Sequence, residues 1–65
     1  MSAVALADQI SCVRRELSMR QRVYPRWVSA GKMTRADSDR EITTMIAVLA
    51  TLQALQRERE PGLFG

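Results

Sequence analysis

The first part of the chain carries apolar side chains at helical spacing. Four of them recur four, three and four residues apart: Leu6, Ile10, Val13 and Leu17. This spacing places them on one stripe of an amphipathic helix, and continuing it reaches Arg20 and then Tyr24. The pattern predicts a helix over about residues 3–23. We expect Pro25 to end it, because proline lacks an N–H and disfavours the helical conformation in the residue before it.

The segment after the first helix contains signals for a short turn of helix and then a stop. Proline suits the first turn of a helix, so residues 25–30 are expected to form a short helical turn. Gly31 is the expected C-terminal cap, because glycine accepts the left-handed conformation that commonly ends a helix. The sequence therefore predicts an elbow over residues 24–33.

A second helix is predicted over about residues 35–59, before Pro61. Thr34 and Asp37 approximate a capping box at its start. Two adjacent apolar stripes follow this helix: Ile42, Met45, Ile46 and Leu49 in one, and Met45, Val48, Leu52 and Leu55 in the other. At about 100° per residue, the two stripes cover roughly half of the helix circumference.

These elements predict an all-α fold, a two-helix hairpin with a short helical elbow. We expect a single helical domain over residues 1–60 and a short apolar tail over residues 61–65. One partner helix covers only a narrow stripe, so the surplus apolar surface predicts a second copy of the chain and a homodimeric four-helix bundle. The residues expected at the dimer interface are Met45, Val48, Leu52 and Leu55.

The chain offers few groups for catalysis or metal binding. It has 65 residues, one cysteine and no histidine, which excludes an internal disulfide, a Cys–His zinc site and a histidine-based triad. Cys12 is expected to be a small apolar residue near the core of the first helix. The carboxylates of Asp37, Asp39 and Glu41 do not share a helix face at their spacing, so they predict no metal site. We expect neither an enzyme nor a cofactor.

The location expected from the sequence is the cytoplasm. No signal peptide is visible at the start, and no run approaches the roughly 20 apolar residues of a membrane span. A lone cysteine suits a reducing compartment.

Basic side chains are concentrated in the middle of the chain. Residues 14–35 carry seven basic side chains and one acidic, a net +6, whereas residues 36–60 carry three basic and five acidic, a net −2. Some arginines are expected to pair with Glu16, Asp37 or Glu41. Tyr24 and Trp27 lie among the basic residues and are expected to pack at the elbow. Alternatively, they serve as anchors of an interface, where tyrosine, tryptophan and arginine are enriched.

Several runs of the sequence resemble small helical proteins encoded by Mu-like and other temperate bacteriophages and prophages. The runs are Cys12-Val13-Arg14-Arg15-Glu16-Leu17, Val23-Tyr24-Pro25-Arg26-Trp27-Val28, Ala30-Gly31-Lys32-Met33-Thr34, Asp39-Arg40-Glu41-Ile42 and Ala47-Val48-Leu49-Ala50-Thr51-Leu52. The resemblance covers most of the chain but not the part from Gln56. It implies a phage origin and a bacterial host cytoplasm, and it carries no specific activity.

The expected function is therefore that of a phage-encoded protein that binds a bacterial host protein and modulates or inhibits it, in host takeover or counter-defence. The residues expected to bind the partner are Arg22, Arg26, Trp27 and Lys32. A competing docking segment is the tail with Leu63 and Phe64. The alternative function is a small DNA-binding or regulatory phage protein that uses the basic face to neutralise phosphates.

Overall fold

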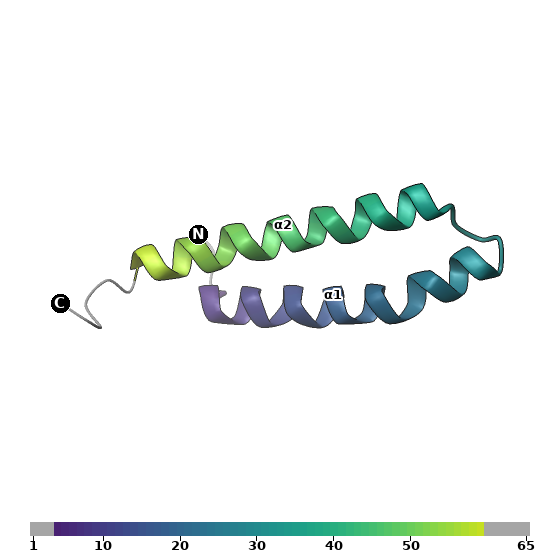
Figure 1. Ribbon diagram of the computed structural model, residues 1–65. Helices are drawn as coiled ribbons and strands as arrows, with labels where there is room; N and C mark the ends of the chain where they lie inside the picture. Colours follow the sequence, from purple (N-terminus) through teal and green to yellow (C-terminus); the bar gives the residue numbers. More distant parts are fainter. Residues whose placement is uncertain (1–3, 60–65) are drawn as a thin grey trace.

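Two long antiparallel helices form a hairpin and make up almost all of the part that the structure describes, residues 4–59 of a computed structural model (Figure 1). α1 spans Leu6–Ser29 and α2 spans Arg35–Arg59. The helices pack side by side, and residues 4–59 contain no strand. The predicted all-α hairpin is therefore confirmed. The predicted tail over 61–65 lies outside the described residues.

α1 runs through Pro25, so the predicted helix end at residue 23 and the separate elbow over 24–33 are wrong. A proline inside a helix removes one backbone hydrogen bond and crowds the carbonyl four residues earlier, here that of Gln21. Gln21 and Pro25 are both exposed, so water can reach this region of the backbone. The side chain of Tyr24, only 9% exposed, packs this turn inside the hairpin. The last turns of α1 bend away from the line of the earlier ones (Figure 1), as expected at a proline.

Gly31 ends α1 in the way the sequence predicts. Its φ angle is +73°, in the left-handed region. Its N–H donates to the Val28 carbonyl at 3.1 Å, and the N–H of Lys32 donates to the Trp27 carbonyl at 2.9 Å. These two bonds form a Schellman motif, which satisfies carbonyls that the helix end would otherwise leave unpaired.

α2 begins at the residue predicted for it and continues to Arg59, the last described residue, and Thr34 caps its first turn. The Thr34 hydroxyl accepts a hydrogen bond from the backbone N–H of Asp37 at 3.0 Å. The Asp37 carboxylate pairs with Arg40 one turn later, so it does not return to the Thr34 N–H as in a full capping box. The cap therefore depends on the threonine hydroxyl.

The contact between the helices buries few side chains. Among residues 4–59, only Ile10, Tyr24 and Ser38 fall below a tenth of their full exposure. The rest of the α1 stripe is half-buried: Leu6, Val13 and Leu17. Cys12 is exposed, so its predicted place near the core is wrong. It precedes Val13 by one residue, and about 100° of rotation turns it away from the stripe.

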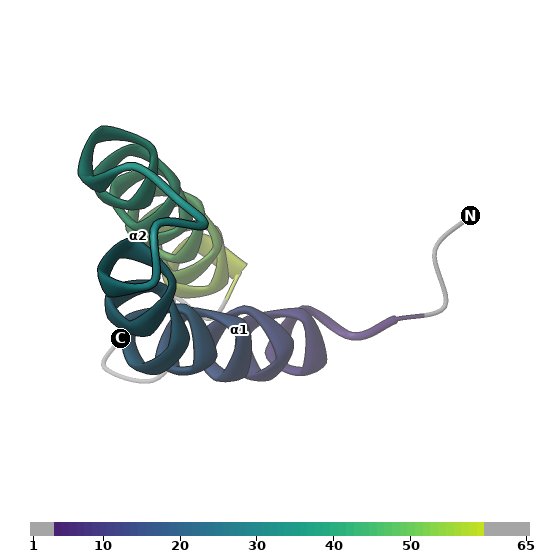
Figure 2. The same ribbon diagram turned by 90° about the vertical axis from the view of Figure 1, so that its right-hand side faces the viewer.

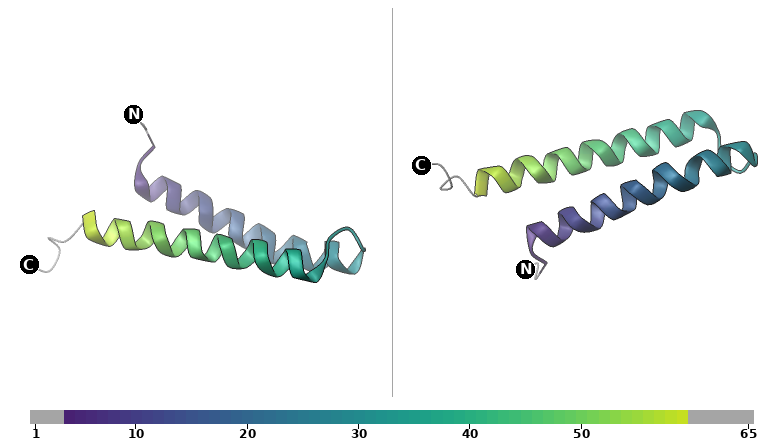
Figure 3. Two further views of the ribbon diagram at one scale, coloured as in Figure 1. Left: turned by 90° about the horizontal axis from the view of Figure 1, so that it is seen from above. Right: turned by 60° about the horizontal axis from the view of Figure 1, so that its bottom comes forward.

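The helix axes cross at an angle, which is visible when the hairpin is seen along its length and from above (Figures 2 and 3). α2 continues past the first turn of α1, so within residues 4–59 its last turns have no helix beside them (Figure 1). Neither helix of the described part is both long and apolar enough to cross a membrane.

Candidate functional site

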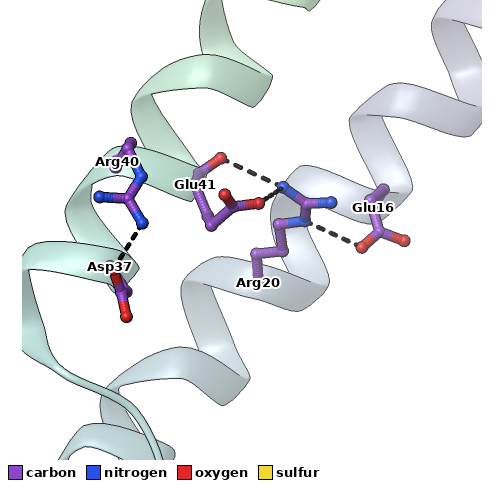
Figure 4. A network of polar contacts seen from close by, with 5 residues as sticks. All are labelled: Glu16, Arg20, Asp37, Arg40 and Glu41. Carbon is purple, nitrogen blue, oxygen red and sulfur yellow. Dashed lines mark hydrogen bonds and ion pairs between the residues drawn. The ribbon is translucent and has the colours of Figure 1, made fainter.

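A polar network joins the two helices, with Arg20 at its centre (Figure 4). The Arg20 Nε donates to a Glu16 carboxylate oxygen at 3.0 Å, and its Nη1 donates to the Glu41 backbone carbonyl at 3.1 Å. The Glu41 carboxylate lies 3.6 Å from the same Nη1, and the guanidinium lies 5.9 Å from the centre of the Tyr24 ring. The hydrogen bond to Glu16 is the main cause that raises the pKa of Arg20, so its charge is held firmly.

This network confirms that arginines pair with Glu16 and Glu41, and Arg40 pairs with Asp37 as expected. These pairs engage three of the four acidic side chains between residues 14 and 41 and leave Asp39 without an ion pair. Between positions 14 and 35, six exposed basic residues form no ion pair with any described residue: Arg14, Arg15, Arg22, Arg26, Lys32 and Arg35. The basic surface of the middle region is therefore not neutralised by the described part of the chain.

Three of these arginines lie in one line along α1. Arg15, Arg22 and Arg26 are seven and four residues apart, which keeps them within about 40° of one another at 100° per residue. Ile10 and Tyr24 mark the opposite side of the helix, which faces α2. We call Arg15, Arg22 and Arg26 the basic stripe.

The four residues predicted to bind a partner do not all share one face. Arg22 and Arg26 belong to the basic stripe. Trp27 lies about 100° further round the helix, 43% exposed, and its ring stacks on Tyr24 with centroids 5.5 Å apart. Lys32 is exposed in the loop, tied by its backbone to Trp27. Of the two aromatics, Tyr24 packs inside as expected, whereas Trp27 keeps an open edge.

The residues predicted for the dimer interface lie on the flank of α2 that α1 only partly covers. Val48 is 40% exposed and Leu55 is 36% exposed. Met45 and Leu52 are half-buried between these residues and α1. Ile46, 47% exposed, lies on the other flank of the apolar arc, so both edges of that arc are uncovered.

A hollow of about 270 Å³ lies between the end of α1 and the first turns of α2, and sequence reasoning missed it. Its lining combines apolar and polar side chains: Pro25, Val28, Ser29, Arg35, Ser38, Asp39 and Ile42. One sequence signal pointed to it: the apolar stripe through Ile42 and Met45, extended backwards, reaches a serine at position 38. The hollow itself depends on the angle at which the two helices cross, and the periodicity of the sequence does not specify that angle.

The described residues gather no group of three histidine, cysteine, aspartate or glutamate side chains that could hold a metal ion. The chemistry of the site is thus that of exposed guanidinium groups, an open aromatic edge and a small mixed hollow. Comparison with protein-family models, with characterised proteins and with solved structures finds no match.

Proposed function

We propose that the protein is a binding protein that attaches, through the basic stripe of α1, to an acidic surface of another protein. The observation that carries this proposal is the arrangement of Arg15, Arg22 and Arg26, which are exposed, aligned and without an acidic partner in the described chain. Arginine is among the residue types that most often anchor protein interfaces, and a patch of one charge speeds encounter with the opposite charge.

Trp27 and Lys32 extend this surface toward the loop. Trp27 presents an apolar edge that stacking on Tyr24 holds in place, so little conformational freedom is lost when a partner covers it. Lys32 adds a mobile charge beside it. In this proposal the arginines orient the partner and Trp27 contributes apolar contact at the edge.

The proposed partner is a bacterial protein, which the phage-encoded chain inhibits or redirects in the host cytoplasm. The support for this origin is the resemblance to small proteins of temperate bacteriophages, carried by runs such as 23–28 and 47–52. The resemblance bears on where the protein acts, and the basic stripe bears on how it binds.

The proposed functional unit is a homodimer in which two hairpins pair into a four-helix bundle. The support is the shortage of core in one chain, because a domain of this size rarely gains more than about 3–5 kcal/mol from its own packing. A second copy seated on Met45, Val48, Leu52 and Leu55 would complete the apolar arc of α2. The basic stripe faces away from α2, so such a dimer leaves it open to a partner.

DNA is the second candidate partner, favoured by the same unpaired arginines. Successive arginines of the basic stripe are separated by about 10 Å and 6 Å along the helix at 1.5 Å per residue. Those intervals suit contacts to phosphates of a nucleic-acid backbone, whose affinity would fall steeply with salt.

The deciding experiment is affinity capture of the tagged protein from bacterial lysate, with and without nuclease. We expect a nuclease-resistant protein partner that is lost in the variant Arg22→Glu with Arg26→Glu. The matched control is Arg57→Glu with Arg59→Glu, which makes the same charge change near the far end of α2 and should keep the partner. Circular dichroism must first show that both variants are folded.

Recovery that disappears with nuclease would overturn the proposal in favour of DNA binding. Submicromolar affinity for duplex DNA at about 150 mM salt, near physiological ionic strength, would do the same. Equal loss of the partner in both charge variants would show that net charge matters and that the basic stripe does not.

A further inference from the structure

The hollow beside the loop has the features of a small recognition site. Three of its lining residues are apolar: Pro25, Val28 and Ile42. Its volume of about 270 Å³ lies just below the range typical of small-molecule sites, about 300–1,000 Å³. A space of this size suits one large side chain better than a whole cofactor.

Ser38 gives this hollow a polar group that the chain leaves unused. The residue is only 6% exposed and lines the hollow. Its hydroxyl makes no hydrogen bond to any described residue. No buried side-chain oxygen of residues 4–59 lacks a hydrogen-bond partner, so the unpaired Ser38 hydroxyl is open to solvent in the hollow, where a ligand can bond to it.

Charged groups of both signs border the same hollow. Arg35 and Asp39 lie one turn apart on α2, both exposed, and neither side chain pairs with another described residue. A guanidinium and a carboxylate at one rim match the polarity of a peptide backbone, which presents carbonyl acceptors and N–H donors. The free guanidinium also matches a carboxylate next to the bound side chain.

We propose that this hollow receives one large apolar side chain from an acidic peptide segment of the partner protein. In that arrangement the side chain packs on Pro25, Val28 and Ile42. The Ser38 hydroxyl donates to a backbone carbonyl of the segment, the Asp39 carboxylate accepts from its backbone N–H, and Arg35 binds an acidic side chain.

This inference rests on the proposed function, and it adds the feature that selects among acidic partners. At 100° per residue, Pro25 and Ser29 lie on the side of α1 next to Arg22 and Arg26. The basic stripe and the hollow are therefore neighbouring surfaces, and one segment can span both. Charge attracts the segment, and the apolar residue determines which segment stays bound.

The test is a titration of the isotope-labelled full chain, followed by amide NMR. The probe is a blocked five-residue peptide with leucine between two pairs of glutamates, and its control carries alanine in place of leucine. We expect the leucine peptide to shift the amide signals of Ser29, Ser38 and Ile42. The alanine peptide should bind about tenfold more weakly, because it lacks most of the apolar contact.

Two variants locate the binding. Ser29→Leu places a larger side chain at the edge of the hollow and should abolish those shifts. Ser18→Leu makes the same change at another exposed serine of α1, outside the lining, and should leave them intact. The amide spectra of the free variants show whether each keeps the hairpin.

Equal binding of the leucine and alanine peptides would overturn the hollow as a site, and so would binding that Ser29→Leu does not weaken. The proposed function would still stand if those peptides shifted only the amides around Arg22 and Arg26. Failure of both peptides to bind would also overturn the hollow as a site, whereas the proposed function is judged separately by the capture experiment.

Discussion

The loop end of the hairpin and its free ends are held together in different ways. Near the loop, Tyr24 and Ser38 are buried, the Arg20 network crosses between the helices, and Gly31 and Thr34 close the two helix ends. Towards the free ends, Ile10 is the buried side chain of the described residues. Large apolar side chains on α2 remain open there, and among the described residues no helix lies beside the last turns of α2 (Figure 1).

The two ends differ because contacts near the turn cost less chain entropy than contacts between the free ends. Arg20 and Glu41 are 21 residues apart, close to the turn, so little chain entropy is lost in bringing them together. Contacts between the first turns of α1 and the last turns of α2 close a longer loop and have fewer polar groups to fix them. The chain therefore specifies its own loop end, and in the proposed dimer a second copy would pack on the free-end half.

The largest effect is expected when Tyr24, the buried aromatic residue of the loop end, is truncated. Truncating a buried aromatic side chain typically costs about 3–5 kcal/mol, which is as much as a domain of this size usually has. We expect Tyr24→Ala to lose helical signal in circular dichroism at room temperature. Trp27→Ala, at the exposed side of the same stack, should lower the free energy of unfolding by far less. Equal losses in urea titrations would show that the loop end is not built on Tyr24.

The mass of the protein in solution tests whether the free-end half pairs with a second copy. Val48→Glu combined with Leu55→Glu should convert the proposed dimer to the 7.3 kDa monomer in light scattering. At a hundredfold excess of protein over the dissociation constant, the loss removes about 2.7 kcal/mol of apparent stability. Ile46→Glu introduces the same side chain on the other flank and should keep the dimer. A wild-type protein that is itself a cooperatively unfolding monomer would refute the comparison.

A smaller effect is expected at Gly31. Alanine there must adopt a left-handed conformation, which costs about 1–2 kcal/mol in unfolding free energy. No atom lies within 4 Å of the added Cβ, so the cost is purely conformational. Gly31→Asn should therefore recover part of the loss, because asparagine tolerates this conformation better. If alanine and asparagine destabilise equally in thermal unfolding, conformation is not the cause.

The smallest effect is expected for the polar network. Arg20→Met keeps the aliphatic stem and removes the bonds to Glu16 and Glu41, and we expect a loss of about 1 kcal/mol because both carboxylates can turn to water. Arg40→Met breaks an exposed pair within α2 and should cost roughly half a kcal/mol or less. Urea unfolding of both variants measures the difference. Equal values would mean that the Arg20 contacts do not hold the loop end.

The parts of the fold that local signals specify were predictable. α2 begins at the predicted residue because a capping threonine marks its start, and Gly31 ends α1 because the left-handed position needs glycine. The end of α1 was not predictable from local rules, which treat Pro25 as a break. Packing of Tyr24 inside the hairpin, together with the exposed position of the proline, keeps the helix intact through residue 29.

The candidate site also has features that the sequence predicts and features that it does not. Exposure of Arg22 and Arg26 follows from helical phase, and so does the partial exposure of Val48 and Leu55. Trp27 is next to Arg26 in the sequence, but the two side chains point about 100° apart around the helix. The prediction that they form one cluster relied on sequence adjacency and was therefore wrong. The hollow around Ser38 depends on the crossing of two helices, and only the assembled structure contains it.

Because α2 extends beyond α1, amide exchange and proteolysis at the end of α2 can be used to follow the proposed dimerisation. An isolated helical end unfolds and refolds within microseconds, so the backbone amides there exchange with solvent deuterium almost as freely as in a peptide. Arg57 and Arg59 place two trypsin cleavage points in this stretch. In the proposed dimer, a second hairpin over the neighbouring turns should protect the same amides and make the two arginines resist cleavage. Proteolysis of the α2 end should then follow the balance between single and paired hairpins.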